Sequence, residues 1–199
     1  AKDTDNGGFN VLYSAYEPGA SVPNVVSIPA ADVPAITLTH RRSSQDAARL
    51  APPPMASLSV SLSNPSTTTQ AHPDRIITFC SAHPKSPMRG CADWSAGILG
   101  LREITKARSI AHHNIAVVMG DLNSSTDHPS FRALLKSGFK DASLTQAAGP
   151  NLTFPRWLKW PRIELDHVLF TPGVRPSQVK SFEIKDTDHL ALVATLALR

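Results

Sequence analysis

A short apolar run at residues 115–119 constrains this chain most, because Gly120, Asp121, Leu122 and Asn123 follow it at once. A continuous apolar run of this length that stops at a glycine predicts a buried strand. A carboxylate and a carboxamide two residues apart at a strand end can turn toward one point. Asp121 can accept a proton or contact a hard cation, and Asn123 can donate to a phosphate oxygen. The same residue types are ordinary in a solvated turn, so this segment alone leaves both interpretations open.

Length and composition fit one domain with a sizeable core. The chain has 199 residues, of which 41% are hydrophobic, and its net charge of +4 permits an anionic partner without requiring one. No apolar run approaches the ~20 residues that span a bilayer, and no signal peptide is visible. The first residue is not methionine, so a processed or trimmed N-terminus is an open alternative. Two cysteines are too few for a disulfide scaffold: either Cys80 and Cys91 pair, or Cys80 is buried in a strand.

Strand and helix patterns along the chain predict an α+β sandwich. Residues 41–74 interrupt them with proline-, serine- and threonine-rich sequence, which indicates a flexible insertion within a single domain of residues 1–199. Alternation at residues 58–62 allows an edge strand there. Helices are expected at residues 93–111, which carry an apolar stripe at i, i+3 and i+4 spacing, and at residues 129–137. The runs expected to form strands are residues 9–13, 25–28, 35–39, 75–80, 163–170, 179–184 and 190–198.

Three further groups of polar residues lie where predicted strands meet loops. His83 follows one strand, Asp166 and His167 interrupt an apolar strand, and Asp188 and His189 precede the last strand. Each group has an ordinary explanation by itself, as a turn histidine, a capping or surface carboxylate, or a solvated turn. Packed sheets, however, can bring several strand ends to one rim. We therefore expect these groups to meet there, beside the acid and amide described above.

The order of these short strings along the chain is specific. Together they resemble the motifs of the endonuclease/exonuclease/phosphatase family, which includes pancreatic deoxyribonuclease and the abasic-site endonucleases. The family's counterparts are Gly-Asp-Phe-Asn, Arg-Ile-Asp-Tyr and a terminal Ser-Asp-His. The resemblance covers about residues 76–199, and four ordered motifs are far more specific than any one of them. The strings that carry it are Ser-Ala-His-Pro at residues 81–84, Gly-Asp-Leu-Asn at 120–123, Arg-Ile-Glu-Leu-Asp-His at 162–167 and Thr-Asp-His-Leu at 187–190.

The resemblance implies both a fold and a chemistry. Members of that family form a four-layer α/β/β/α sandwich of two packed, mainly antiparallel sheets, with the site at one rim. They cleave phosphoester bonds with a divalent cation, usually Mg²⁺ or Mn²⁺. The expected activity is therefore metal-dependent hydrolysis of phosphodiester or phosphomonoester bonds, as in a nuclease or in a phosphatase of lipids or small molecules.

By the same resemblance, each matching polar residue has an expected role. His189 lies beside the scissile phosphate, and Asp166 orients it and favours its protonated form, since a nearby carboxylate raises the pKa of a histidine. Asp121 orients or deprotonates the attacking water, and Asn123 holds a phosphate oxygen. Acids, histidines and an amide suit phosphoryl transfer, which needs mainly positioning and charge neutralisation. Two matches complete the set: Asp188, as a metal ligand, and His83, as a second phosphate-facing histidine.

The chain departs from the family pattern near its start. The family has an asparagine on its first strand and a metal-binding glutamate on a following segment. Asn10 lies in a strand-like run without a suitable acid after it, and Glu17 lacks the expected surroundings. The domain is therefore expected to lack its N-terminal part, with a weakened metal site, because a hard cation is held by clustered carboxylates. Exposed sheet edges are also expected, which makes a homodimer through those edges a hypothesis.

Basic and aromatic residues near the site segments indicate the kind of substrate. Trp160 and Arg162 are the residues that we expect to contact it. Their mixture suits the backbone and stacked bases of a nucleic acid, and equally a phospholipid head group at a membrane surface. The alternative is that the tryptophans pack a loop against the sheet. Residues 153–155, Thr-Phe-Pro, resemble a segment of bacterial relatives that are exported or membrane-anchored, which is the location expected here.

Two other interpretations remain open from the sequence. A non-catalytic or degenerate binding module that keeps the fold would explain the missing glutamate, although the retained His189, Asp166 and Asp121 argue against it. A zinc protein that uses His112 and His113 is disfavoured, because adjacent histidines point apart on a helix and no paired ligand spacing supports them.

Overall fold

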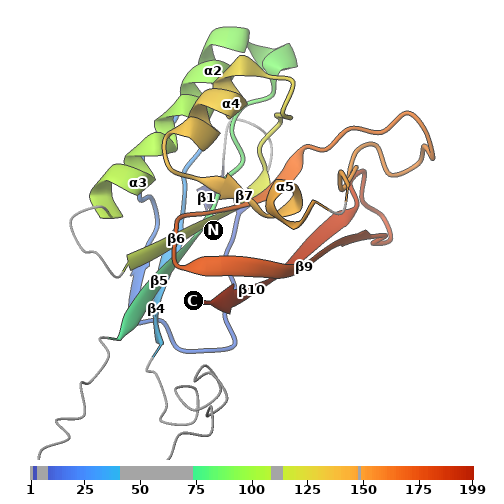
Figure 1. Cartoon of the computed structure of the whole chain (residues 1–199). Helices are drawn as coiled ribbons and strands as arrows, with labels where there is room; N and C mark the ends of the chain where they lie inside the picture. The colour runs from blue at the N-terminus through green and yellow to red at the C-terminus, as the bar shows by residue number, and fades with distance from the viewer. Residues whose placement is uncertain (1, 4–8, 41–73, 109–113, 148) are drawn as a thin grey trace, which may run out of the picture.

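The computed structural model describes residues 2–3, 9–40, 74–108, 114–147 and 149–199 (Figure 1). The predicted edge strand at residues 58–62 and nearly all of the predicted insertion lie outside these residues. His112 and His113, considered above for zinc, also lie outside them. No helix in the described ranges is long and apolar enough to cross a membrane.

Six strands form the main sheet, in the order β3-β4-β5-β6-β8-β7. Neighbouring strands are antiparallel except for β5 and β6, which are parallel. The prediction of a mainly antiparallel sheet is confirmed, and so is the buried strand before Asp121. The bounds are β3 Ala20–Val22, β4 Ala35–His40, β5 Arg75–Ser81, β6 Asn114–Asp121, β7 Lys140–Asp141 and β8 Asp166–Phe170.

Strand β6 is buried on both faces because it divides two hydrophobic cores. Ala116 and Val118 belong to a core shared with the helices, whereas Ile115 and Val117 belong to a core shared with the second sheet. Successive side chains of a strand point to opposite faces, so a continuous apolar run is what such a position requires.

Helices cover one face of the main sheet (Figure 1). They are α2 (Cys91–Gly100), α3 (Arg102–Arg108) and α4 (Pro129–Lys136), and a short 3-10 turn, η1 (Pro87–Arg89), precedes α2. The single helix expected at residues 93–111 is two helices that meet at Leu101. The buried residues Ile98, Leu101 and Ile104 continue one apolar stripe across the junction, so the periodicity did not reveal the break.

The opposite face of the main sheet meets a second sheet of two antiparallel strands, β9 (Val174–Phe182) and β10 (Ala191–Leu198). A cavity of about 810 Å³ with mainly apolar walls lies between the sheets, lined by residues such as Phe79, Met119 and Leu196. The short helix α5 (Ala142–Gln146) contacts β9, and β1 (Lys2–Asp3) pairs with β2 (Phe9–Asn10). Two packed sheets with helices on one outer face confirm the predicted α+β fold class. The described residues supply three of the four expected layers: the helices, the main sheet and the second sheet.

Two local expectations near the sheet are settled by the structure. The strand predicted at residues 25–28 is wrong: the Val25 N–H donates to the carbonyl of Val33 in a loop, and Ile28 forms only one isolated bridge. Cys80 and Cys91 are not joined by a disulfide, since Cys80 is buried in β5 and Cys91 is exposed at the start of α2.

Candidate active site

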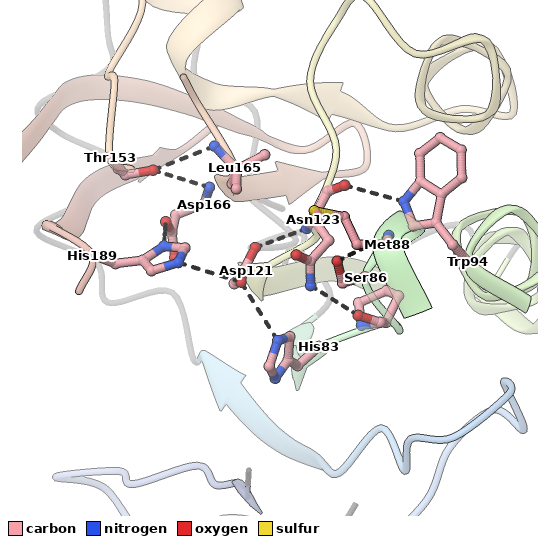
Figure 2. A network of polar contacts seen from close by, with 11 residues as sticks. His83, Ser86, Met88, Trp94, Asp121, Asn123, Thr153, Leu165, Asp166 and His189 are labelled. Atoms are coloured by element: carbon pink, nitrogen blue, oxygen red, sulfur yellow. Dashed lines mark hydrogen bonds and ion pairs between the residues drawn. The ribbon is translucent and has the colours of Figure 1, made fainter. Parts of the chain in front are cut away.

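Strand register brings the predicted polar groups to one edge of the main sheet. Asp121 at the end of β6 is paired with Asp166 at the start of antiparallel β8. The parallel strand β5 ends at Ser81, opposite Met119, so His83 follows it at the same edge. Figure 2 shows the resulting cluster, with Asp121 between two histidines.

A cavity of about 770 Å³ opens at this edge. All six residues that were matched to catalytic or metal-binding motifs line it, together with apolar residues that include Met88, Phe154 and Ile184. The sequence therefore located the cavity correctly, although the roles of its residues stay predictions. The six are His83, Asp121, Asn123, Asp166, Asp188 and His189.

His189 is held between two carboxylates. Its Nδ1 lies 2.7 Å from Asp166 Oδ2, and its Nε2 lies 3.7 Å from Asp121 Oδ2. Burial lowers the pKa of His189, but the hydrogen bond to Asp166 and the nearby negative charges outweigh it, so the pKa is raised. Asp166 is fixed in turn, because its backbone N–H donates to Thr153 Oγ1. The result is an oriented imidazole at the cavity wall, with its protonated form favoured by the two carboxylates.

Asp121 is the centre of the cluster. Its Oδ1 accepts a hydrogen bond from the Asn123 N–H at 2.8 Å, and its Oδ2 lies 3.5 Å from His83 Nε2. Asn123 takes a left-handed conformation with φ of 47°, and its amide donates to the carbonyl of Pro84 at 3.1 Å. An asparagine tolerates this conformation better than most residues. The acid and the amide therefore face the same cavity from one tight turn.

Gly120 makes this turn geometrically possible. Its φ is 143°, and a Cβ at this position would lie 2.1 Å from the carbonyl oxygen of Ala82. That close approach lets the segment after β5 pass beside the end of β6, where the Ala82 N–H donates to Met119. No residue with a side chain fits here without movement of the backbone.

We expect Gly120→Ala to lower the free energy of unfolding by about 2–3 kcal/mol, because both backbone strain and overlap with Ala82 oppose it. Urea denaturation followed by circular dichroism measures the change. Gly138→Ala is the matched control, since Gly138 also has a positive φ but a Cβ there meets nothing within 4 Å. Strain alone should cost the control about 1 kcal/mol. Equal losses in the two variants would contradict the steric argument.

Trp94 on α2 holds the turn from the side of the helices, as Figure 2 shows. Its indole Nε1 donates to the carbonyl of Asn123 at 3.1 Å and to Ser124 Oγ at 3.0 Å. The sequence placed Trp94 only in the apolar stripe of a helix. The indole N–H contributes nothing to hydrophobic periodicity, so the sequence did not predict its hydrogen bonds to the turn at the site.

A buried pair, Asp141 and His167, anchors the same turn from the other side. His167 Nδ1 lies 2.8 Å from Asp141 Oδ2, and His167 Nε2 donates to the carbonyl of Ser124 at 2.8 Å. Burial lowers the pKa of His167, but the hydrogen bond and charge of Asp141 outweigh it, so the pKa is raised. The sequence drew attention to His167 inside an apolar strand, but nothing in the spacing pointed to its partner.

Asp141, Glu164 and His167 are also the one group of metal-ligand types that the described residues bring together, with ligand atoms within 4.8 Å of one another. The proton positions argue against a divalent cation there. A carbonyl oxygen can only accept, so His167 Nε2 carries a proton, and Nδ1 faces a carboxylate. An imidazolium with both nitrogens protonated has no lone pair for a metal. Burial also raises the pKa of Glu164, which disfavours its charged form. This buried cluster fits a structural ion pair.

The cavity at the sheet edge has a donor set that suits a hard cation better. Asp121 and Asp188 both line it, and both carboxylates act on the charge of His189. Mg²⁺ is usually held by one or two carboxylates together with water and substrate phosphate, so two acids here fit the ion.

The two residues predicted to bind substrate lie outside the lining of this cavity, on the loop at residues 154–162. Arg162 donates from Nε to the carbonyl of Pro155 and from its terminal nitrogen to that of Arg156. Trp160 is 78% exposed. The structure thus shows Arg162 holding its own loop, and substrate contact by either residue stays a prediction.

The comparison with protein families settles the class of the molecule. The model of the endonuclease/exonuclease/phosphatase family matches residues 2–189. The chain belongs to this family. Its members are typically metal-dependent phosphoesterases, among them nucleases and phosphatases. The resemblance inferred from four motifs is thereby confirmed. No curated protein matches the chain.

Solved structures support the fold of this family member at low sequence identity. A family protein from Leptotrichia buccalis has a TM-score of 0.56 at 14% identity, covering 92% of this chain and 63% of its own. The human Nocturnin catalytic domain with bound sulfate has a TM-score of 0.51 at 13% identity, covering 90% and 58%. TDP2 of D. rerio, humanized by 14 mutations, has a TM-score of 0.50 at 14% identity, covering 62% and 56%. This chain thus spans between half and two thirds of the length of these structures.

Proposed function

We propose that this protein hydrolyses phosphoester bonds with a divalent cation. The observation that carries the proposal is His189, whose Nδ1 is held by Asp166 at 2.7 Å while its Nε2 faces Asp121 across the cavity. A histidine with this orientation and a raised pKa can donate a proton to a phosphate oxygen as negative charge develops there.

Each neighbouring group has a complementary task in the proposal. Asp121, whose Oδ2 faces both histidines, orients or deprotonates the attacking water. One N–H of the Asn123 side-chain amide donates to the carbonyl of Pro84, and its second N–H can donate to a phosphate oxygen. His83 donates to another phosphate oxygen. Asp188 and Asp121 would hold Mg²⁺ or Mn²⁺, which supplies charge neutralisation at the phosphoryl group when bound.

The rival proposal is a binding module that keeps the fold without catalysis. Three acids among the described residues line the cavity, and Asp166 is engaged by His189, which leaves Asp121 and Asp188 for a cation. Weak metal binding would favour this alternative. The intact pair of Asp166 and His189 favours the enzyme, because a phosphate-binding module needs no oriented proton donor.

Hydrolysis of bis(p-nitrophenyl) phosphate and p-nitrophenyl phosphate, with Mg²⁺ or Mn²⁺ and with EDTA, tests the proposal. We expect turnover that EDTA abolishes and a half-maximal cation concentration on the order of millimolar, because few carboxylates hold the ion. Asp188→Asn should raise that concentration, while Asp127→Asn, an exposed acid outside the cavity, should leave it unchanged. Phosphate binding without turnover would support the binding module. Turnover that resists EDTA would contradict the metal requirement.

A longer version of the protein should be assayed beside this chain. Because this chain spans only part of its structural relatives, a version extended upstream tests whether further residues contribute cation ligands. A lower half-maximal cation concentration in the extended version would show that they do.

A further inference from the structure

The loop at residues 154–162, called here the aromatic loop, exposes large apolar side chains. Trp157 is 64% exposed, Leu158 is 39% exposed and Trp160 is 78% exposed. Lys159, also exposed, lies between them in sequence. The loop extends away from the two sheets, as the orange segment of Figure 1 shows. Monomeric proteins rarely present such a group of side chains to water without a partner for it.

The aromatic loop is fixed to the active-site segment. The Arg156 N–H donates to the carbonyl of Asp188 at 2.8 Å, and its Nε donates to the carbonyl of Thr187 at 2.6 Å. Arg162 bonds to the carbonyls of Pro155 and Arg156. Both guanidinium groups therefore bond to backbone carbonyls, and the tip of the loop presents indoles, a leucine and one ammonium group.

The same loop forms part of the rim of the cavity. The Phe154 ring lies 4.7 Å from the His189 ring and 5.8 Å from the Trp157 ring, measured between centroids. Three other residues that line the cavity are also exposed and apolar: Met88 at 95%, Ile163 at 49% and Ile184 at 45%. The cavity proposed to take a charged phosphate is thus lined in part by exposed apolar side chains.

We propose that the aromatic loop docks onto a lipid membrane surface, with Trp157, Leu158 and Trp160 at the depth of the head groups and Lys159 toward anionic lipids. Tryptophan favours this depth because its ring is apolar and its N–H is polar. Apolar side chains with an adjacent cation are what interfacial binding requires.

A nucleic acid fits this surface less well. A groove that follows a phosphate backbone needs a row of available cations between the stacking rings. In the aromatic loop Lys159 is the one cation between the two tryptophans, and its neighbour there, Leu158, has no ring to stack on a base. Arg156 and Arg162 lie outside this segment, and both donate to backbone carbonyls. Docking of the loop would bring the cavity against the lipid head groups. The consequence that the substrate is a lipid-borne phosphoester rests on the function proposed above.

The chain carries its own probe for this docking. It has three tryptophans, of which Trp157 and Trp160 are exposed and Trp94 is buried against the turn that contains Asn123. We would mix the protein with vesicles of phosphatidylcholine containing about one third phosphatidylglycerol, so that the surface is anionic. Flotation measures binding, and lipids brominated at the head-group end of the acyl chains quench tryptophans that lie at the membrane interface. Flotation with quenching of the wild-type protein is the expected result.

Two double variants sharpen the test. Trp157→Ala/Trp160→Ala should raise the lipid concentration for half-maximal binding about tenfold or more, since two indoles no longer enter the interface. Its remaining Trp94 should show no quenching. Tyr13→Ala/Tyr16→Ala also removes two exposed aromatic rings, 92% and 76% exposed, and should bind vesicles like the wild type. Equal losses in both double variants would overturn the assignment to the loop.

Other partners are outcomes of the same experiment. Quenching of the loop tryptophans by oligo(dT), with no vesicle binding, would overturn the proposal in favour of a nucleic acid. A mass that doubles with concentration and falls back in Trp157→Ala/Trp160→Ala would overturn it in favour of a second copy of this chain. Vesicle binding that persists in His189→Ala supports docking independently of catalysis. Turnover of bis(p-nitrophenyl) phosphate without vesicle binding would overturn the docking and leave the proposed function standing.

Discussion

Replacement of His189 by alanine is expected to lower phosphoesterase turnover by about a thousandfold or more while the fold stays intact. The imidazole is the one group in the cavity that is both oriented by a carboxylate, at 2.7 Å from Asp166, and shifted toward its protonated form. Its removal takes away the proposed proton donor for the phosphate oxygen and leaves the proposed cation ligands in place. Turnover of bis(p-nitrophenyl) phosphate at saturating Mn²⁺ measures the effect.

Two further variants separate catalysis from folding. His40→Ala removes an exposed histidine at the end of β4 that pairs with Arg75, at the opposite end of β5 from the cavity, and should leave turnover unchanged. Asp166→Asn should cause a smaller loss than His189→Ala and should lower the pKa seen in the pH profile of turnover, because the hydrogen-bonded carboxylate is gone. Full activity of a folded His189→Ala protein would refute the assignment of the proton donor.

Asp141→Asn is expected to lower the free energy of unfolding by about 3–5 kcal/mol, the usual effect of breaking a buried ion pair. Both side chains are 1% exposed, so the charge of His167 would be left without its counter-ion in the interior. Asparagine can still cap α5, where Asp141 Oδ1 accepts from the Leu144 N–H, so the variant isolates the charge. Urea denaturation at pH 6 gives the difference from the wild type.

The pH dependence of stability provides a second signature of this pair. The folded pKa of His167 is raised above its ordinary value, so its stabilising contribution is complete below about pH 6.5 and declines as the pH rises through the folded pKa. The wild type should therefore lose unfolding free energy between pH 6 and pH 9, and Asp141→Asn should show a flatter profile.

An exposed ion pair serves as the matched control. Lys85 Nζ lies 2.7 Å from Asp93 Oδ2, about as close as the atoms of the buried pair. Because the Asp93 side chain is 53% exposed, Asp93→Asn should cost less than about 1 kcal/mol. A loss for Asp141→Asn as small as that for Asp93→Asn would show that the buried pair is not charged.

The sequence predicted those residues of the site that belong to the four motifs, which follow one another in the order typical of the family. Asp121 and Asn123 were placed at a strand end, and the structure puts them there with Asp166 opposite and His189 in contact. Such residues are predictable because strand ends are local features and the motif order identifies which ends meet. Their chemical roles need more than the geometry and stay predictions.

The supporting contacts were not predictable, because each joins an ordinary residue to a distant segment. Trp94 reads as one more apolar residue of a helix, yet its N–H reaches a turn about thirty residues later. Asp141 reads as a loop acid until β7 pairs with β8 and places it beside His167. Hydrophobic periodicity indicates which face of a helix or strand is apolar. It does not indicate which distant backbone or side-chain group a polar atom on that element will contact.

The sequence separation of the groups that meet at Asp121 has a consequence for the order of folding. His83 and His189, which face the same carboxylate, are about a hundred residues apart, and the segments between them form four strands and all the described α-helices. Closing so long a stretch of chain is entropically slow, and rates fall as contacting residues lie further apart in sequence. Helical circular dichroism should therefore return early in refolding, while the proposed phosphoesterase activity should return only with the slowest phase, when the last strands join the edge of the main sheet.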